Sequence, residues 1–202
     1  MNLRETYNRI AEDWHRDHSH DDWWVEGTDA FVKELPSGAH VLDVGCGSGV
    51  KSKYLAKHGL HVVGIDISDK LLEIARRETP EAEFRELSMY DLDSTSETFD
   101  GIFAQASLLH IPRRDAGAVV KKMADRLTPD GFLYLAVKET RSDKPEEGVF
   151  KEDGYDYERF FSYFTMDELE QYLADAGLKI VLSLRNPHPS GKTVWLQIIG
   201  RK

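Results

Sequence analysis

Cysteine is almost absent from this chain of 202 residues, which contains only Cys46. A single cysteine cannot form an intramolecular disulfide, so we expect a protein of the reducing cytoplasm. No apolar run approaches the ~20 residues that a membrane helix requires. The N-terminal residues 1–5 also lack the apolar segment of a signal peptide. We therefore expect neither a membrane span nor export.

Positive charge is also in short supply. The chain carries 26 Lys and Arg against 36 Asp and Glu, which gives a formal net charge of -10. Affinity for nucleic acid grows with the number of phosphates that a protein neutralises, so this balance argues against a nucleic-acid partner. The apolar fraction of 41% is that of an ordinary globular protein, and the length suits one domain with a buried core.

Short apolar strands alternate with amphipathic helices along most of the chain. Two helices are predicted first, at residues 3–16 and after Thr28 as N-cap. Between residues 40 and 137 we predict five strands separated by helices or turns: His40–Val44, His61–Ile65, Glu83–Leu87, Phe99–Ala104 and Phe132–Val137. This alternation predicts a doubly wound α/β fold, a mostly parallel sheet with helices on both faces.

The C-terminal end follows a different pattern. A capping box at Thr165–Glu168 begins a helix that ends at Gly177, and two strands follow at Ile180–Leu184 and Val194–Ile199. The loop between these strands has no room for a crossover helix. The last pair of strands must therefore be antiparallel.

Glycines dominate the turn after the first strand of the sheet, at Gly45, Gly47 and Gly49. Glycine lets the backbone turn sharply and approach a ligand closely, and the helix that follows offers unpaired N–H groups. A dinucleotide site would place its third glycine at position 50, where this chain has Val50. Asp66 ends the next strand, where a carboxylate can accept both hydroxyls of an adenosine ribose.

At these residues the sequence resembles the class I methyltransferases that use S-adenosylmethionine (SAM). Val41–Gly49 resembles their first motif, and Gly64–Ser68 resembles their ribose-binding motif. Met89–Asp91 is similar to the adenine-contacting segment. Leu127–Gly131 is similar to the turn before the fifth strand, with Asp130 where the family often has glycine.

The resemblance covers residues 40–200 and carries several implications. It implies seven strands in the order 3-2-1-4-5-7-6 with the seventh antiparallel, within a single methyltransferase domain spanning residues 1–202. It implies SAM as cofactor and a small molecule as methyl acceptor, and it leaves the methylated atom (O, N, C or S) and the oligomeric state open. The residues that it assigns to SAM lie in the glycine loop and at the ends of the second, third and fourth strands: Asp43, Gly45, Cys46, Gly47, Gly49, Asp66, Ile67, Tyr90, Asp91, Gln105 and Ala106.

Two other functions fit part of this pattern. An NAD(P)-binding oxidoreductase is disfavoured by the glycine spacing and by the terminal hairpin. A SAM-binding module that regulates a partner without catalysis stays open as an alternative. Methyl transfer depends mostly on alignment, although a hydroxyl, thiol or protonated amine also needs a base. His110, just after the fourth strand, is the candidate base, and a capping or packing role for it stays equally open.

Two aromatic-rich segments are candidates for the acceptor site. Residues 1–38 form a predicted helical cap with Tyr7 and Trp14, and residues 140–164 a lid-like insertion with Tyr157 and Phe161. Long connections of this kind often close over ligands at the carboxyl ends of strands. The histidines and aspartates of residues 15–22 fit a solvated polar loop, so we predict no metal site.

Overall fold

The computed structural model describes residues 2–142, 146–151, 157–188, 191 and 193–202. Helices α1 (Leu3–His18) and α2 (Val25–Glu34) precede the sheet. The sheet strands are β1 (His40–Val44), β2 (His61–Asp66), β3 (Glu83–Glu86), β4 (Phe99–Gln105), β5 (Leu127–Lys138), β8 (Lys179–Pro187) and β9 (Val194–Arg201). The later helices are α3 (Val50–Lys57), α4 (Asp69–Glu78), α5 (Arg113–Asp125) and α6 (Met166–Asp175), with short 3₁₀ turns η1 (Met89–Ser94) and η2 (Leu108–His110).

The seven strands lie in the order β3-β2-β1-β4-β5-β9-β8. Strands β1 to β5 pair in parallel, whereas β9 is antiparallel to both β5 and β8. Counted within this sheet, β8 and β9 are the sixth and seventh strands, so the order is 3-2-1-4-5-7-6. The predicted fold class and the antiparallel final pair are confirmed.

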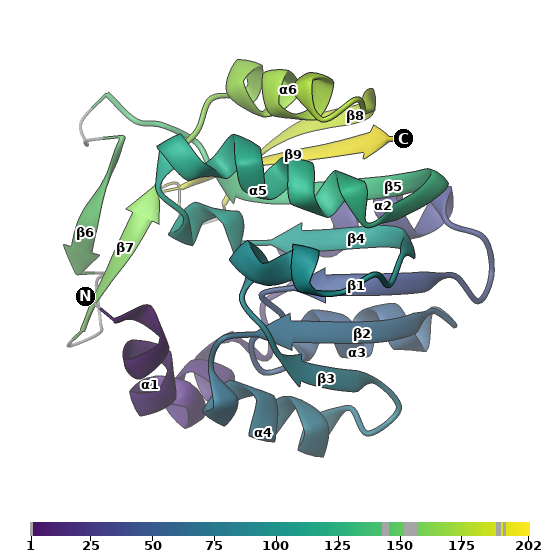
Figure 1. Ribbon diagram of the computed structural model, residues 1–202. Helices are drawn as coiled ribbons and strands as arrows, with labels where there is room; N and C mark the ends of the chain where they lie inside the picture. Colours follow the sequence, from purple (N-terminus) through teal and green to yellow (C-terminus); the bar gives the residue numbers. More distant parts are fainter. Residues whose placement is uncertain (1, 143–145, 152–156, 189–190, 192) are drawn as a thin grey trace.

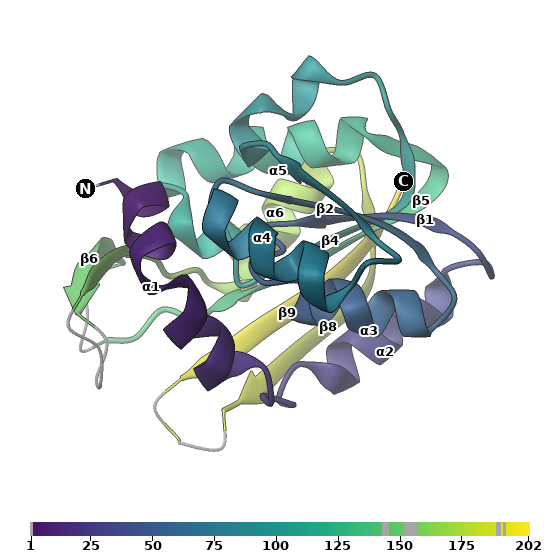
Figure 2. The same cartoon turned by 90° about the horizontal axis from the view of Figure 1, so that it is seen from below.

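Helices cover both faces of the sheet (Figures 1 and 2). Helices α2 and α3 bury Phe31 and Leu55 against one face, where Phe103 and Tyr134 stack with ring centroids 4.6 Å apart. Helices α5 and α6 cover the other face through Val120 and other apolar side chains. Among the described residues, no helix combines the length and the apolarity needed to cross a lipid bilayer.

The segment between β5 and α6 contains a second sheet of two antiparallel strands, β6 (Glu147–Lys151) and β7 (Glu158–Ser162). The sequence predicted only a lid-like insertion here. The β6–β7 pair lies at the end of the main sheet toward which β1, β2 and β4 point, and α1 lies at that same end (Figure 1). This arrangement brings the two aromatic-rich segments together.

The start of α2 differs from the prediction. The helix begins at Val25, and Thr28 is buried inside it rather than at its N-cap. Its hydroxyl donates to the carbonyl of Trp24 at 2.9 Å, so the threonine side chain has a hydrogen-bond partner inside the helix. Helix α2 packs on the sheet, so within residues 1–38 it is α1 that lies near the strand ends.

Candidate active site

A cavity of about 390 Å³ opens at the carboxyl ends of the parallel strands, beside α1. Ligand sites of open α/β sheets lie at this edge. Most of the residues predicted from the sequence line it: Tyr7, Trp14, Asp43, Gly45, Cys46, Gly47, Asp66, Ile67, Tyr90, Gln105, Ala106 and His110.

The glycine loop forms one wall of this cavity. Gly45 and Gly47 have φ angles of +73° and +54°, which residues other than glycine rarely adopt. A Cβ on Gly45 would lie 2.4 Å from the Cβ of Ser107, so close packing also requires glycine there. A Cβ on Gly47 would meet nothing within 4 Å, and Gly47 lines the cavity. Backbone can therefore approach a ligand directly at Gly47.

Asp66 connects the loop to the end of β2. Its carboxylate accepts from the backbone N–H of Gly47 and of Ser68, each at 2.9 Å. Burial raises the pKa of Asp66, and the backbone N–H donors of Ser68, Gly47 and Ile67 oppose that rise. A carboxylate fixed by backbone donors on the cavity wall is suited to accept hydroxyl groups from a ligand.

A second buried carboxylate, Asp43, lies at the end of β1. Its side chain accepts from the hydroxyl of Ser52 at 2.6 Å. Burial raises the pKa of Asp43 to about 6, although the Ser52 bond and the positive charge of Lys51 oppose the shift. Burial in turn lowers the pKa of Lys51, which also lines the cavity. Charges of both signs thus lie at the loop end of the cavity.

The end of β4 contributes polar groups that have no hydrogen-bond partner among the described residues. These are both side-chain atoms of the Gln105 amide and the hydroxyl of Ser107, residues that are 6% and 4% exposed. Ala106, between them, has a φ of +55°. Buried polar atoms without partners are costly, and strained backbone concentrates at functional sites. Since both side chains line the cavity, a polar ligand would satisfy them.

Four predicted residues are not part of this lining. Gly49 adopts φ +80° as the N-cap of α3, and a Cβ there would lie 3.0 Å from that of Ala75, so it serves helix packing. Asp91 is exposed on η1. Tyr157, just before β7, and Phe161, within β7, are both buried, and Phe161 packs on His110 with ring centroids 5.1 Å apart.

Two further lining residues, Ser48 and Met89, lie inside motifs that the sequence analysis identified. The lining also includes residues that the sequence reasoning missed: Leu3, His18, Val50, Lys51, Leu71, Leu87, Ser88, Ser107 and Ile111. Ser88 immediately precedes the predicted Met89–Asp91 segment, and Lys51 follows the glycine loop, so proximity in sequence could have indicated both residues. His18 gave no such signal because it depends on how α1 docks. Burial lowers the pKa of His18, and the positive charges of Lys51 and Arg159 lower it further while Asp21 opposes them.

The candidate base His110 faces α1. Its Nε2 lies 2.9 Å from the hydroxyl of Tyr7, and its Nδ1 lies 2.8 Å from the carbonyl oxygen of Phe160. A carbonyl only accepts, so Nδ1 carries a proton in the neutral ring and Nε2 accepts from Tyr7. Arg159 of β7, itself 2% exposed, donates to the Tyr7 hydroxyl at 2.9 Å.

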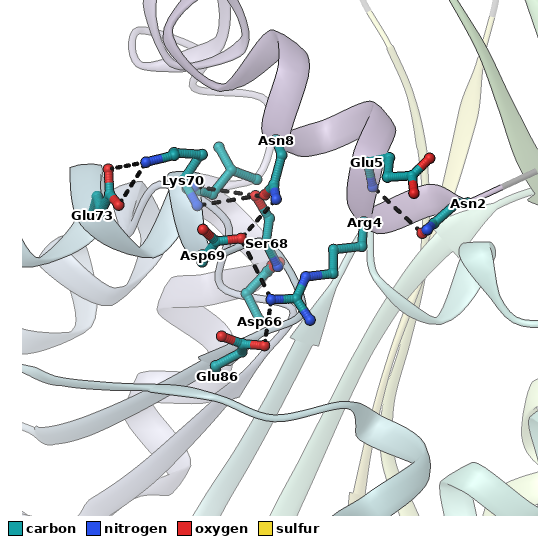
Figure 3. Close-up of polar contacts among 11 residues, drawn as sticks. Asn2, Arg4, Glu5, Asn8, Asp66, Ser68, Asp69, Lys70, Glu73 and Glu86 are labelled. Carbon is teal, nitrogen blue, oxygen red and sulfur yellow. Dashed lines mark hydrogen bonds and ion pairs between the residues drawn. The ribbon is translucent and has the colours of Figure 1, made fainter.

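Helix α1 is anchored to the rim of the cavity by Asn8 (Figure 3). The side-chain oxygen Oδ1 of Asn8 accepts from the hydroxyl of Ser68 at 2.7 Å, and its side-chain nitrogen Nδ2 donates to the carboxylate of Asp69 at 2.6 Å. Arg4, one turn earlier, forms an ion pair with Glu86 at 2.7 Å. The same Ser68 donates its backbone N–H to Asp66, so α1 contacts the segment that holds the cavity carboxylate.

Residues around this site are similar in sequence to known methyltransferases. The family described as "Methyltransferase domain" matches residues 41–131, from β1 to the turn within β5. The Ubiquinone biosynthesis O-methyltransferase of Xylella fastidiosa is 38% identical over 114 residues, covering 54% of this chain and 46% of that protein. The protein of the same name from Xanthomonas axonopodis pv. citri is 30% identical over 159 residues, covering 72% and 64%. The chain thus spans less than two thirds of the length of these relatives.

Solved structures share the whole fold. The 1,6-didemethyltoxoflavin-N1-methyltransferase of Burkholderia thailandensis, solved with its substrate and S-adenosylhomocysteine, has a TM-score of 0.80 at 23% identity, covering 99% of this chain and 87% of that one. The magnesium protoporphyrin IX methyltransferase of Synechocystis with S-adenosylhomocysteine has a TM-score of 0.76 at 20% identity, covering 99% and 98%. Residues 41–131 thus match the methyltransferase-domain family, and the chain shares the fold of these SAM-dependent methyltransferases over nearly its whole length.

Proposed function

We propose that the protein transfers the methyl group of SAM to an oxygen of a small-molecule acceptor. The observation that carries the proposal is the cavity at the strand ends. There the glycine loop and Asp66 share the lining with Gln105 and Ser107, whose buried polar groups have no hydrogen-bond partner in the described part of the chain. The sequence relatives named as O-methyltransferases support oxygen as the methylated atom.

The residues of the cavity fit SAM in three ways. The bare backbone at Gly47 allows close approach of the methionine part, and the buried amide of Gln105 with the hydroxyl of Ser107 gives polar groups that a ligand would satisfy. Asp66 would accept the ribose hydroxyls. Ile67, Met89 and Tyr90 offer apolar surface for the adenine ring. SAM itself supplies an electrophilic methyl group on a sulfonium, so alignment provides most of the rate.

Helix α1 and the β6–β7 segment form the proposed lid over the acceptor. Tyr7 and Trp14 of α1 line the cavity, and Phe161 of β7 supports His110 from behind. A lid that excludes water would fix the acceptor beside the methyl group. The net charge of -10 supports a small molecule rather than nucleic acid as acceptor. The single cysteine, buried as a free thiol, supports a cytoplasmic location.

Incubation with SAM labelled in its methyl group tests the proposal. The purified protein is mixed with a protein-free extract of small metabolites, and methylated products are identified by mass spectrometry. We expect label in at least one small molecule, at a methoxy group, and loss of this label with Asp66→Ala. Label on no product, or on nucleic acid or protein only, would reject the proposal.

A further inference from the structure

Tyr7 of α1 lines the cavity close to the residues that follow β4. The side chain is 9% exposed and lines the cavity together with Ala106, Ser107 and His110. The resemblance assigns Ala106 and the preceding Gln105 to SAM. Tyr7 therefore shares one wall of the cavity with His110 and the end of β4.

The hydrogen bonds around this phenol have a defined direction. The Phe160 carbonyl oxygen requires the proton of neutral His110 to be on Nδ1, so Nε2 accepts from the Tyr7 hydroxyl at 2.9 Å. Arg159 donates to the same phenol oxygen at 2.9 Å. The His110 nitrogen that can accept a proton thus faces Tyr7, and a cation stabilises any negative charge that develops on the phenol oxygen.

We propose that Tyr7 and His110 form a proton-accepting pair that prepares an acceptor hydroxyl for methylation. This inference rests on the proposed function. Tyr7 is the group that touches the acceptor, and His110 is the base that acts through Tyr7. The pair therefore selects for acceptors whose nucleophilic oxygen carries a proton, the chemical class of alcohols and phenols.

The proton and electron pairs balance in one step. The acceptor O–H gives its proton to the Tyr7 oxygen while the Tyr7 proton passes to Nε2 of His110. The acceptor oxygen forms a bond to the methyl carbon, the carbon–sulfur bond breaks, and its electron pair stays on sulfur. The products are a methyl ether, a neutral thioether and a protonated His110, and Tyr7 ends as it began.

The pair depends on the docking of α1, because Tyr7 comes from α1 and His110 from η2, 103 positions apart. Asn8, the residue after Tyr7, bonds to Ser68 and Asp69 beside the cavity carboxylate (Figure 3). Arg159 of β7 is the charged group that donates to Tyr7, and its guanidinium also lies over the ring of Tyr157 and interacts electrostatically with His18 of α1. The docking of one helix thus brings the two groups of the pair together.

Two site variants and two matched controls test the pair. The variants are Tyr7→Phe and His110→Gln. The controls are Tyr54→Phe and His58→Gln, a neighbouring tyrosine and histidine on and just after α3, with ring centroids 4.5 Å apart, that do not line the cavity. Each protein is assayed for methyl transfer from labelled SAM to the extract's methylated product, across pH 5–9, and for SAM affinity by calorimetry.

We expect each site variant to lower transfer by ~10²-fold while SAM affinity stays within about twofold. The wild-type rate should rise with pH as His110 loses its proton, and His110→Gln should lose this rise. The controls should match the wild type. Transfer within about threefold of wild type in either site variant overturns the inference while leaving the proposed function intact. A product methylated only at a thioether or tertiary amine overturns both.

A measurement without acceptor tests the contact itself. In ¹⁵N spectra of the histidine rings, neutral His110 should appear as the Nδ1–H form, and Tyr7→Phe should shift its Nε2 resonance. An unshifted Nε2 resonance in Tyr7→Phe overturns the pairing even if no acceptor is methylated.

Discussion

At the scale of single residues, Asp66 is the group on which ligand affinity should depend most. Its carboxylate is already oriented by two backbone N–H groups, so little ordering remains when a ribose binds. We expect Asp66→Ala to weaken SAM binding by about 2–3 kcal/mol, or roughly 30- to 150-fold, in a calorimetric titration. Asp93→Ala is the matched control, because Asp93 is an exposed carboxylate paired with Lys122 outside the cavity. Equal affinity in both variants would remove the ribose assignment.

Gly47 should be required for binding and not merely for folding. Gly47→Val places a side chain at φ +54° on the cavity wall, whereas Gly59→Val meets similar backbone strain at φ +80° between α3 and β2. Neither Cβ has a neighbour within 4 Å. Both variants should lose about 1–2 kcal/mol of stability in denaturant unfolding. Only Gly47→Val should lose measurable SAM binding. Comparable binding by the two variants would show that the glycine loop does not contact SAM at Gly47.

Asp43 should make stability depend on pH in a defined window. Burial raises its folded-state pKa to about 6, so between about pH 4 and pH 6 the unfolded chain ionises this carboxyl while the folded chain keeps its proton. Its contribution to stability is therefore lost as the pH rises through that window. Asp43→Asn should gain up to about 3 kcal/mol over wild type between pH 4 and pH 6, measured by urea unfolding. If the difference in unfolding free energy between Asp43→Asn and wild type does not change with pH, the pKa of Asp43 is not raised in the folded protein.

Local sequence predicted most of the cavity residues because adjacent residues on one loop or strand end stay together in space. Gly45, Gly47 and Asp66 are such residues. The Tyr7–His110 contact joins positions 103 apart, so it depended on the docking of α1 and had no local signal. Gly49 followed the same spacing as its neighbours, yet its backbone turns it toward Ala75 and away from the cavity.

At the scale of elements, α1 should behave as a docked helix whose hold on the site depends on Asn8. Asn8→Ala removes the bonds to Ser68 and Asp69, at a cost of about 1–2 kcal/mol of docking. We expect faster hydrogen exchange in α1 and faster release of SAM, with no change in the sheet. Asp13→Ala, which removes only an ion pair within α1, is the control. Exchange in α1 that is unchanged by Asn8→Ala would show that the helix is held by its apolar contacts alone.

Strands and helices with a clear hydrophobic period were predicted correctly, including the antiparallel final pair. The start of α2 was predicted wrongly because threonine is a common N-cap residue. In the structure Thr28 lies inside the helix, where its hydroxyl donates to the carbonyl of Trp24. The β6–β7 pair was missed because its short strands alternate weakly between exposed and buried positions and lie in an insertion. Asp130 replaces the family's usual glycine at φ +66°, a conformation that aspartate tolerates better than most residues.

At the scale of the whole molecule, the fold places ligand chemistry at one end of the sheet. The parallel strands end at the cavity, and both α1 and the β6–β7 pair lie at that end (Figure 1). The antiparallel β9 and β8 extend the sheet on the side of β5 away from the cavity strands. The ligand-binding residues therefore lie at one end of the sheet, and the rest of the fold holds them in position.

Calorimetric titration of the purified chain with SAM, S-adenosylhomocysteine and NAD⁺ tests the central claim most directly. The account predicts one binding site per chain for SAM and for S-adenosylhomocysteine, abolished by Gly47→Val and retained in Gly59→Val, with no heat of binding for NAD⁺. Binding of NAD⁺ without SAM, or SAM binding that survives Gly47→Val unchanged, would contradict it.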